Sequence, residues 1–357
     1  MTLRIALVGG PMYDHIEMMF APGEVEIIVK ADHPTLNRSV ATMLAAGERI
    51  DVLATHSKYA PSQSSWLHPL DDLVSASTSE PLTPAAVALC RFRNQQFCLP
   101  RLIDVRLAWS WADRVPIVPT TWTELAASKT VFGFTGRESG AFGLFFELLT
   151  GAGGSLFDAE LHPTMDTPES RDALALIAQL GQRAPKDLPD WHYDQVDRAL
   201  LDGRIDMAAA WPGGWSAIVA SQLPLVPSLY PAGAVRRVSY SGCHAWAIPR
   251  TCGDLRGAAA MIERLASYDA HALDASFGSI CAHRAALEAV VPISDVDAKR
   301  LGLIQATIAE MMITYPPLTF FPLIEDAGAA AITAVLRGEL TPRQAASKIQ
   351  EVALGAS

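Results

Sequence analysis

Residues 51–73 read DVLATHSKYAPSQSSWLHPLDDL, and this stretch decides which kind of fold we expect. Its first five residues, DVLAT, form a short apolar run that is typical of a buried strand. The run stops at a polar loop that holds His56, Lys58 and Tyr59. Such a loop is either an ordinary solvated connection or one wall of a ligand site.

The segments before this stretch predict a mainly parallel sheet. LRIALVG (3–9) and VEIIV (25–29) have the pattern of strands, and LNRSVATMLAAGE (36–48) has that of a helix ending near Gly47. Strand–helix–strand order is typical of α/β domains, which bind ligands in loops at the carboxyl ends of parallel strands. The turn 9–13 and the loop 55–59 both follow such ends, so the sequence favours a ligand site there.

The rest of the chain continues the α/β pattern. FCLPRLIDVRLAWSW (97–111) predicts an extended segment with Asp104 and Arg106 on one face. PTTWTEL (119–125) contains a capping box, with Glu124 three residues after the capping threonine. A strand is expected at 241–249 and a loop and turn at 277–287. Further helices are expected at 168–182, 254–268, 269–276, 297–312, 324–337 and 341–354.

The composition limits the class of protein. The chain has 357 residues, of which 50% are hydrophobic and 18% charged, enough for two globular lobes. A formal net charge of −10 disfavours nucleic acid or an anionic membrane as a partner. The start, MTLRIALVGGPMYDH, has the pattern of a first strand rather than a secretory signal. The chain is therefore expected to be made without a signal or to be shown after its removal.

The five cysteines have no metal-binding spacing. Cys90 and Cys98 are close in sequence, as are Cys243 and Cys252, so either pair could form a disulfide. The odd number favours buried free thiols instead. No nucleophile elbow, phosphate-binding loop or HExxH motif is found in the sequence, so we expect neither an enzyme nor a cofactor or metal site.

Two tryptophans flank the sequence WPGGW (211–215), which follows a predicted buried strand. Trp211 and Trp215 could provide a flat surface for a ligand, or both indoles could pack in the core. For Asp104 the alternatives are an ion pair with Arg106 or an acceptor for ligand hydroxyls. His244 lies in a predicted strand and is either a ligand contact or a core histidine.

Seven stretches in this order resemble family 1 extracellular solute-binding proteins of ABC importers, the maltose-binding-protein-like group. They cover nearly the whole chain and are DVLATHSKYAPS, LPRLIDVRLAW with PTTWTEL, TGAGGSLF, ALLDGRIDMAAAWPGGW, SGCHAWAIP, FGSICAHRAAL and LRGELTPRQAASKIQ. The resemblance implies a two-lobed clamshell of class II, each lobe a mainly parallel sheet flanked by helices. It implies lobe one at 1–107 and 247–296, lobe two at 108–246 and 297–357, and a ligand cleft between them.

Matched position by position, the family's ligand loops fall on residues 10–13 and 55–59, its hinge carboxylate on Asp104, and its aromatic surface on residues 211–215. Its C-terminal aromatic segment falls on residues 315–321. Thr55 stands where sugar-binding members present a tryptophan. The full set of expected ligand-binding residues is Gly10, Met12, Tyr13, Thr55, His56, Ser57, Lys58, Tyr59, Asp104, Glu138, Ser139, Trp211, Trp215, His244, Arg284 and Tyr315.

The expected function is the capture of a carbohydrate, either a mono- or oligosaccharide or a polyol, for an ABC importer. The resemblance implies ABC permease subunits as partners, a monomer, and a periplasmic or extracellular location. The alternative is a cytosolic clamshell sensor that binds a small polar metabolite and signals to a partner protein. The sequence leaves the identity of the solute open.

Overall fold

The computed structural model describes residues 1–10 and 12–356, and Pro11 of the predicted turn 9–13 lies outside them. The chain divides into two compact units, each with its own sheet and helices. Unit 1 consists of Met1–Asp104, Gly242–Val291 and Pro317–Thr319. Unit 2 consists of Val105–Ser241, Pro292–Pro316 and Phe320–Ser357, of which Ser357 is not described.

Unit 1 is built on a five-stranded sheet in the order β2-β1-β3-β12-β6. β1 pairs in parallel with both β2 and β3, whereas β12 runs antiparallel to its neighbours β3 and β6. Four strands therefore point the same way, and the start of β12 lies beside the ends of β3 and β6. The strands are β1 (Leu3–Val8), β2 (Val25–Ala31), β3 (Val52–His56), β6 (Leu99–Asp104) and β12 (Gly242–Ala247).

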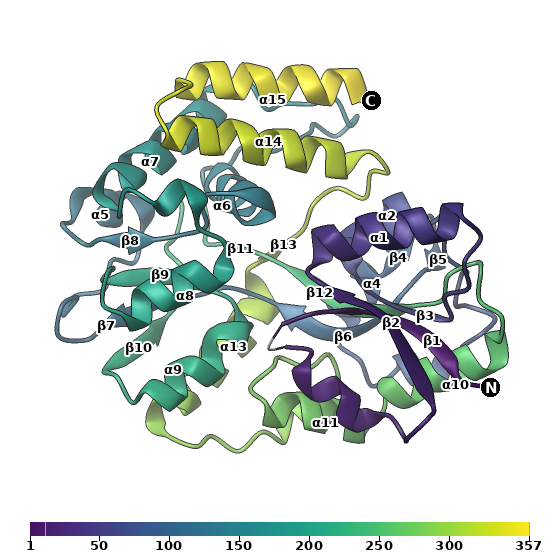
Figure 1. The fold of residues 1–357 in the computed structure, drawn as a ribbon. Coiled ribbons are helices and arrows are strands. Elements are labelled where there is room, and N and C mark those ends of the chain that lie inside the picture. The colour runs from purple at the N-terminus through teal and green to yellow at the C-terminus, as the bar shows by residue number, and fades with distance from the viewer. Residues whose placement is uncertain (11, 357) are drawn as a thin grey trace. The chain divides into compact units, whose positions relative to one another are not determined.

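Helices cover both faces of this sheet. α1 packs against β1 and β2, and α4 packs against β6 and β12. Figure 1 shows α10 across the sheet from α1. The longer helices are α1 (His33–Ala45), α10 (Leu255–Leu265) and α11 (Tyr268–Ser276). The short elements are η1 (Asp14–Met19), η2 (Ser57–Tyr59), α2 (Ala60–Gln63), α3 (Ala76–Ser79), α4 (Pro84–Leu89), β4 (Arg91–Phe92), β5 (Gln95–Gln96) and α12 (Arg284–Glu288).

Unit 2 has a four-stranded sheet in the order β10-β7-β9-β8. β8 and β9 pair in parallel, and β7 runs opposite to both of its neighbours, β9 and β10. Two further strands, β11 (Ser239–Tyr240) and β13 (Met312–Ile313), form a separate parallel pair. The four sheet strands are β7 (Leu107–Trp111), β8 (Phe132–Gly133), β9 (Met207–Ala210) and β10 (Leu225–Ser228).

The central helix of unit 2 is α6, which is buried along nearly its whole length. Its Phe- and Leu-rich sequence packs against α7 and α14, and α15 lies alongside α14 (Figure 1). Burial on all sides explains why this helix carries almost no charge. The helices are α5 (Trp122–Ala127), α6 (Glu138–Gly151), α7 (Pro168–Arg183), η3 (Leu188–Asp190), α8 (Tyr193–Leu201), η4 (Pro212–Gly214), α9 (Trp215–Ser221), α13 (Asp295–Glu310), α14 (Phe321–Leu336) and α15 (Pro342–Ala356).

The structure corrects three local predictions. The first helix begins at His33 rather than at residue 36, because the Asp32 side chain accepts a hydrogen bond from the Thr35 amide and caps it. The predicted single segment 97–111 is two strands, β6 and β7, in different sheets. The predicted loop 277–287 contains the start of α12, which the side chain of His283 caps.

Candidate functional site

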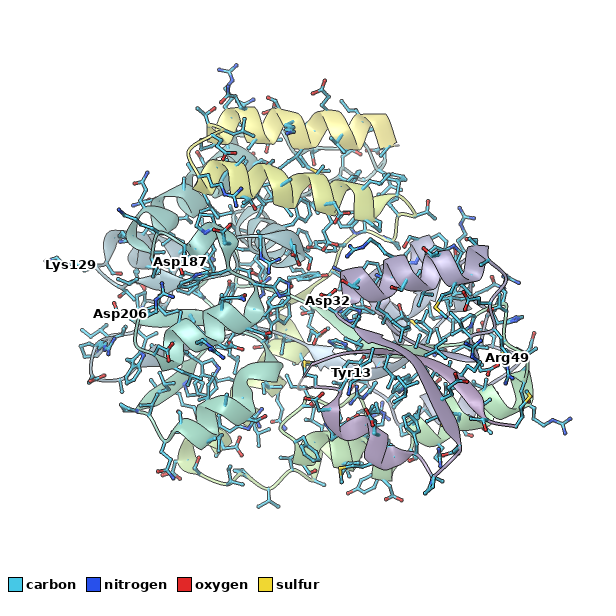
Figure 2. The ribbon with its side chains drawn as sticks, viewed as in Figure 1. Tyr13, Asp32, Arg49, Lys129, Asp187 and Asp206 are labelled. Carbon is cyan, nitrogen blue, oxygen red and sulfur yellow. The ribbon has the colours of Figure 1, made fainter. Side chains whose placement is uncertain are left out.

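The topology of unit 1 gathers five polar side chains at one end of its sheet. His56 is the last residue of β3, and it lies directly opposite His244 of the antiparallel strand β12. Gly242, two residues earlier on β12, lies opposite Asp104 at the end of β6. Tyr13 follows the end of β1, and His33 follows the end of β2. Figure 2 labels Tyr13 and also Asp32, the capping residue directly before His33. We call Tyr13, His33, His56, Asp104 and His244 the histidine cluster.

Asp104 is the centre of the cluster. Its Oδ2 lies 3.0 Å from Nε2 of His56 and 3.4 Å from Nε2 of His244. Nδ1 of His56 accepts the backbone N–H of Lys58 at 3.2 Å, so the network assigns the ring proton to Nε2, which donates to Asp104. One carboxylate oxygen therefore holds two imidazoles in place.

The second nitrogen of His244 joins the remaining two members. Its Nδ1 lies 3.0 Å from the hydroxyl of Tyr13 and 3.3 Å from Nε2 of His33. Tyr13, His56, Asp104 and His244 are each less than 9% exposed, and His33 is half-buried. The cluster is thus a connected polar network with little solvent, in which hydrogen bonds are strong and fixed in direction.

Burial keeps the imidazoles neutral. It lowers the pKa of both His56 and His244 to about 3, and it places the pKa of His33 well below its ordinary value. Burial also raises the pKa of Asp104, while His244 and Lys58 lower it. Near neutral pH the cluster therefore offers uncharged ring nitrogens and a tyrosine hydroxyl around a carboxyl group, a set that can both donate and accept hydrogen bonds.

A glycine makes room for this arrangement. A Cβ atom added to Gly242 would come within 2.2 Å of Cε1 and 2.8 Å of Nε2 of His56. Only a residue without a side chain lets the ring of His56 lie over β12 and reach Asp104. This requirement could not be predicted from the sequence, because Gly242 and His56 lie far apart along the chain.

Two buried side chains missed by sequence reasoning support Tyr13. The guanidinium of Arg101 lies 4.3 Å from the ring centre of Tyr13 and donates to the carbonyl of Met12 at 2.9 Å. It also forms a two-point ion pair with Asp274, at 2.6 and 3.0 Å. His33 was missed as well, although it follows a predicted strand end, as the residues of the 55–59 loop do.

The other unit 1 candidates have varied surroundings. The Thr55 hydroxyl is buried and donates to Gln63 at 2.8 Å, and Ser57 Oγ accepts the backbone N–H of Cys243 at 3.0 Å. Both therefore support the local fold. Lys58 and Tyr59 are half-buried beside the cluster, with the Tyr59 ring centre 6.1 Å from that of His33. Gly10 is exposed and Met12 half-buried.

The structure does not bring Arg284 into the histidine cluster. Its guanidinium donates to the carbonyls of Glu80 and Leu82, at 2.9 and 3.1 Å. These bonds tie the start of α12 to the chain before α4. Asp104 likewise has no bond to Arg106, which instead lies 3.4 Å from Glu147 in unit 2. The ion-pair alternative for Asp104 was therefore wrong.

In unit 2 the two tryptophans of WPGGW differ. Trp215 is only 7% exposed, stacks on Trp109 with ring centres 5.4 Å apart, and lies 4.2 Å from the guanidinium of Arg300. It packs in the core. Trp211 is half-buried and lies 4.5 Å from the guanidinium of the buried Arg106. Trp211 is thus the more exposed of the two indoles.

Aromatic rings and two helix-start residues lie near Trp211. The rings of Tyr193 and Tyr240 meet Trp211 edge to face, and Tyr315 stacks on Tyr240 with ring centres 4.3 Å apart. Ser139 at the start of α6 lies 3.2 Å from the Tyr193 hydroxyl. Its neighbour Glu138 is exposed, contacts His192 at 3.2 Å and has φ +56°, a left-handed conformation rare outside glycine.

Among the described residues, one group has the geometry for a metal ion, namely Asp158, Glu160 and His162. Asp158 already accepts the backbone N–H groups of Glu160 and His162, so a turn explains the group. In the part of the chain that the structure describes, no helix has the length and apolar character needed to cross a membrane.

Comparison with solved structures identifies the fold. The maltose-bound MalE3 protein of T. maritima superposes with a TM-score of 0.89 at 20% identity, covering 99% of this chain and 100% of that one. The chain has the same fold as this protein. A ribitol complex of an ABC transporter solute-binding protein from Agrobacterium radiobacter K84 gives a TM-score of 0.86 at 19% identity, covering 98% and 97%.

A third match is an ABC transporter solute-binding protein from Thermotoga lettingae TMO bound with α-D-tagatose. It has a TM-score of 0.83 at 21% identity, covering 99% of each chain. No protein-family model and no curated protein matches the sequence. The agreement along the full length therefore establishes the two-lobed α/β fold predicted from the sequence.

Proposed function

We propose that the chain is a solute-binding protein that captures a carbohydrate or polyol for an ABC importer. The observation that carries the proposal is the histidine cluster at the carboxyl ends of the unit 1 strands. It joins neutral imidazoles and a tyrosine hydroxyl to the Asp104 carboxyl group, at the place where α/β sheets bind ligands. The similar structures hold maltose, ribitol and tagatose, each bound by its own protein.

The chemistry of the cluster suits a ligand rich in hydroxyl groups. Each sugar hydroxyl donates one hydrogen bond and accepts others, so it pairs with neutral imidazoles, a tyrosine and a carboxylate. The half-buried indole of Trp211 suits the C–H face of a sugar ring. Glu138, Ser139 and Tyr193 near Trp211 offer further polar contacts.

The location and the partners belong to the same proposal. We propose that the chain works in the periplasm or outside the cell, as a monomer that delivers its ligand to ABC permease subunits. We further propose that it acts by binding alone, without catalysis. Support for both comes from the fold shared with ABC transporter solute-binding proteins.

A thermal-shift screen of the full chain against sugars, polyols, amino acids and organic acids tests the proposal. A ligand at about 100 times its dissociation constant stabilises a protein by about 2.7 kcal/mol, which such a screen detects. We expect the midpoint to rise with one or a few carbohydrates. A rise with amino acids or organic anions and none with carbohydrates would contradict the proposal.

A further inference from the structure

Three buried thiols meet in unit 1. Cys90, the C-terminal cap of α4, and Cys243, on β12, have their Sγ atoms 3.4 Å apart although 153 residues separate them. Both are fully buried, as is Cys98, which lies close enough to raise the pKa of Cys90. The pairs suggested by sequence proximity were Cys90 with Cys98 and Cys243 with Cys252, so the fold points to a different pair.

Hydrogen bonds hold the main chain in place at both cysteines. The backbone N–H of Cys243 donates to Ser57 at 3.0 Å, and the carbonyl of Cys90 accepts the N–H of Phe97 at 3.0 Å. A disulfide bond is about 2.05 Å long, so the sulfurs need to approach by about 1.4 Å, a movement that two side-chain rotations can share. Among the described residues all five cysteines are free thiols in this structure.

We propose that Cys90 and Cys243 form a disulfide when the chain folds in an oxidising environment. In this step the two thiols give up two electrons and two protons to a disulfide oxidant, which is released as two thiols, and one S–S bond forms in the protein. The bond would tie α4 to the strand that carries His244. The proposal goes beyond ligand capture and does not depend on which ligand binds.

The remaining cysteines provide controls. Cys252 is half-buried and lies beside Asp51 rather than beside another thiol. Cys281 packs with Leu102 and Ala286 in an apolar cluster.

Because burial raises the pKa of Cys90 well above its ordinary value, little reactive thiolate exists at this residue in the folded chain. The bond should therefore form during folding, before the core closes.

The experiment is to unfold and reduce the full chain, and to refold it with a mixture of oxidised and reduced glutathione. The product is then denatured, alkylated with iodoacetamide without reduction, and weighed by mass spectrometry. We expect three alkylated cysteines and, after digestion, a peptide linking Cys90 to Cys243. Cys252→Ala and Cys98→Ala each keep four cysteines, so for both we expect two alkylated cysteines and the same linked peptide.

Two outcomes overturn the proposal. One is five alkylated cysteines in refolded protein, and the other is a bridge from Cys90 to Cys98. A thermal melt of the refolded chain guards against loss of fold in the variants. We expect a reductant to lower the midpoint of the wild type and to leave that of Cys243→Ala unchanged. An unchanged wild-type midpoint in a chain with five free thiols would also count against the bond.

Discussion

Replacement of Gly242 by alanine tests the geometry of the histidine cluster. The added Cβ would lie 2.2 Å from Cε1 of His56, whereas two carbon atoms pack at about 3.5 Å. The ring must therefore retreat by about 1.3 Å, which lengthens its 3.0 Å hydrogen bond to Asp104 beyond the range of such bonds. We expect a loss of about 1–3 kcal/mol in unfolding free energy, the usual cost of overpacking.

The same change should weaken ligand binding. A hydrogen bond to a charged group contributes about 1.5–3 kcal/mol, so displacement of His56 should raise the dissociation constant by at least about tenfold. The assays are urea unfolding and calorimetric titration with the sugar found by the screen. Gly302→Ala is the matched control, because nothing lies within 4 Å of its Cβ position in α13, and it should leave affinity unchanged. Wild-type affinity in Gly242→Ala would show that ligand binding does not need His56 in this position.

Three further outcomes follow from the structure. Asp104→Asn keeps the shape of the side chain but removes the charge that two imidazoles share. Calorimetry should show a binding free energy weaker by about 1.5–3 kcal/mol. Unchanged affinity would remove Asp104 from the site. Trp211→Ala should lower ligand affinity more than stability, whereas Trp215→Ala, a core truncation, should lower the unfolding free energy by about 3–5 kcal/mol in urea unfolding. Equal losses of unfolding free energy in the two variants would contradict their different burial. Burial lowers the pKa of His271 to about 4, so below pH 6.5 the unfolded chain binds a proton at this residue that the folded chain does not bind. Between pH 7.5 and 4.5 the unfolding free energy of the wild type should therefore fall by about 2–3 kcal/mol more than that of His271→Gln. Parallel pH profiles of the two proteins would contradict this.

The regular part of the fold was accessible from the sequence because its patterns are local. The runs at 3–9, 25–29 and 51–55 predicted β1, β2 and β3 to within two residues, and the capping box at Thr121 and Glu124 is present. The helix predicted at 168–182 is α7. Hydrophobic period and capping chemistry need only neighbouring residues, so a single sequence suffices to find them.

The site was accessible only in part, because its partners come from distant segments. The rule that loops at strand ends carry ligand residues pointed to Tyr13 and His56, and both lie in the histidine cluster. It could not show that β12 runs backwards through the sheet and so brings His244 to the same end. Nor could it separate Trp211 from Trp215, since their burial depends on packing against other elements.

Whether the histidine cluster binds the ligand is measured by calorimetric titration. The carbohydrate found by the screen is titrated into wild type, His244→Ala and His162→Ala. His244 contacts Tyr13, His33 and Asp104, whereas His162 lies on an exposed turn in unit 2. We expect wild-type affinity for His162→Ala and at least about tenfold weaker binding for His244→Ala, a loss of about 1.4 kcal/mol or more. Equal affinity of all three proteins, with the fold of each intact by thermal melting, would contradict it.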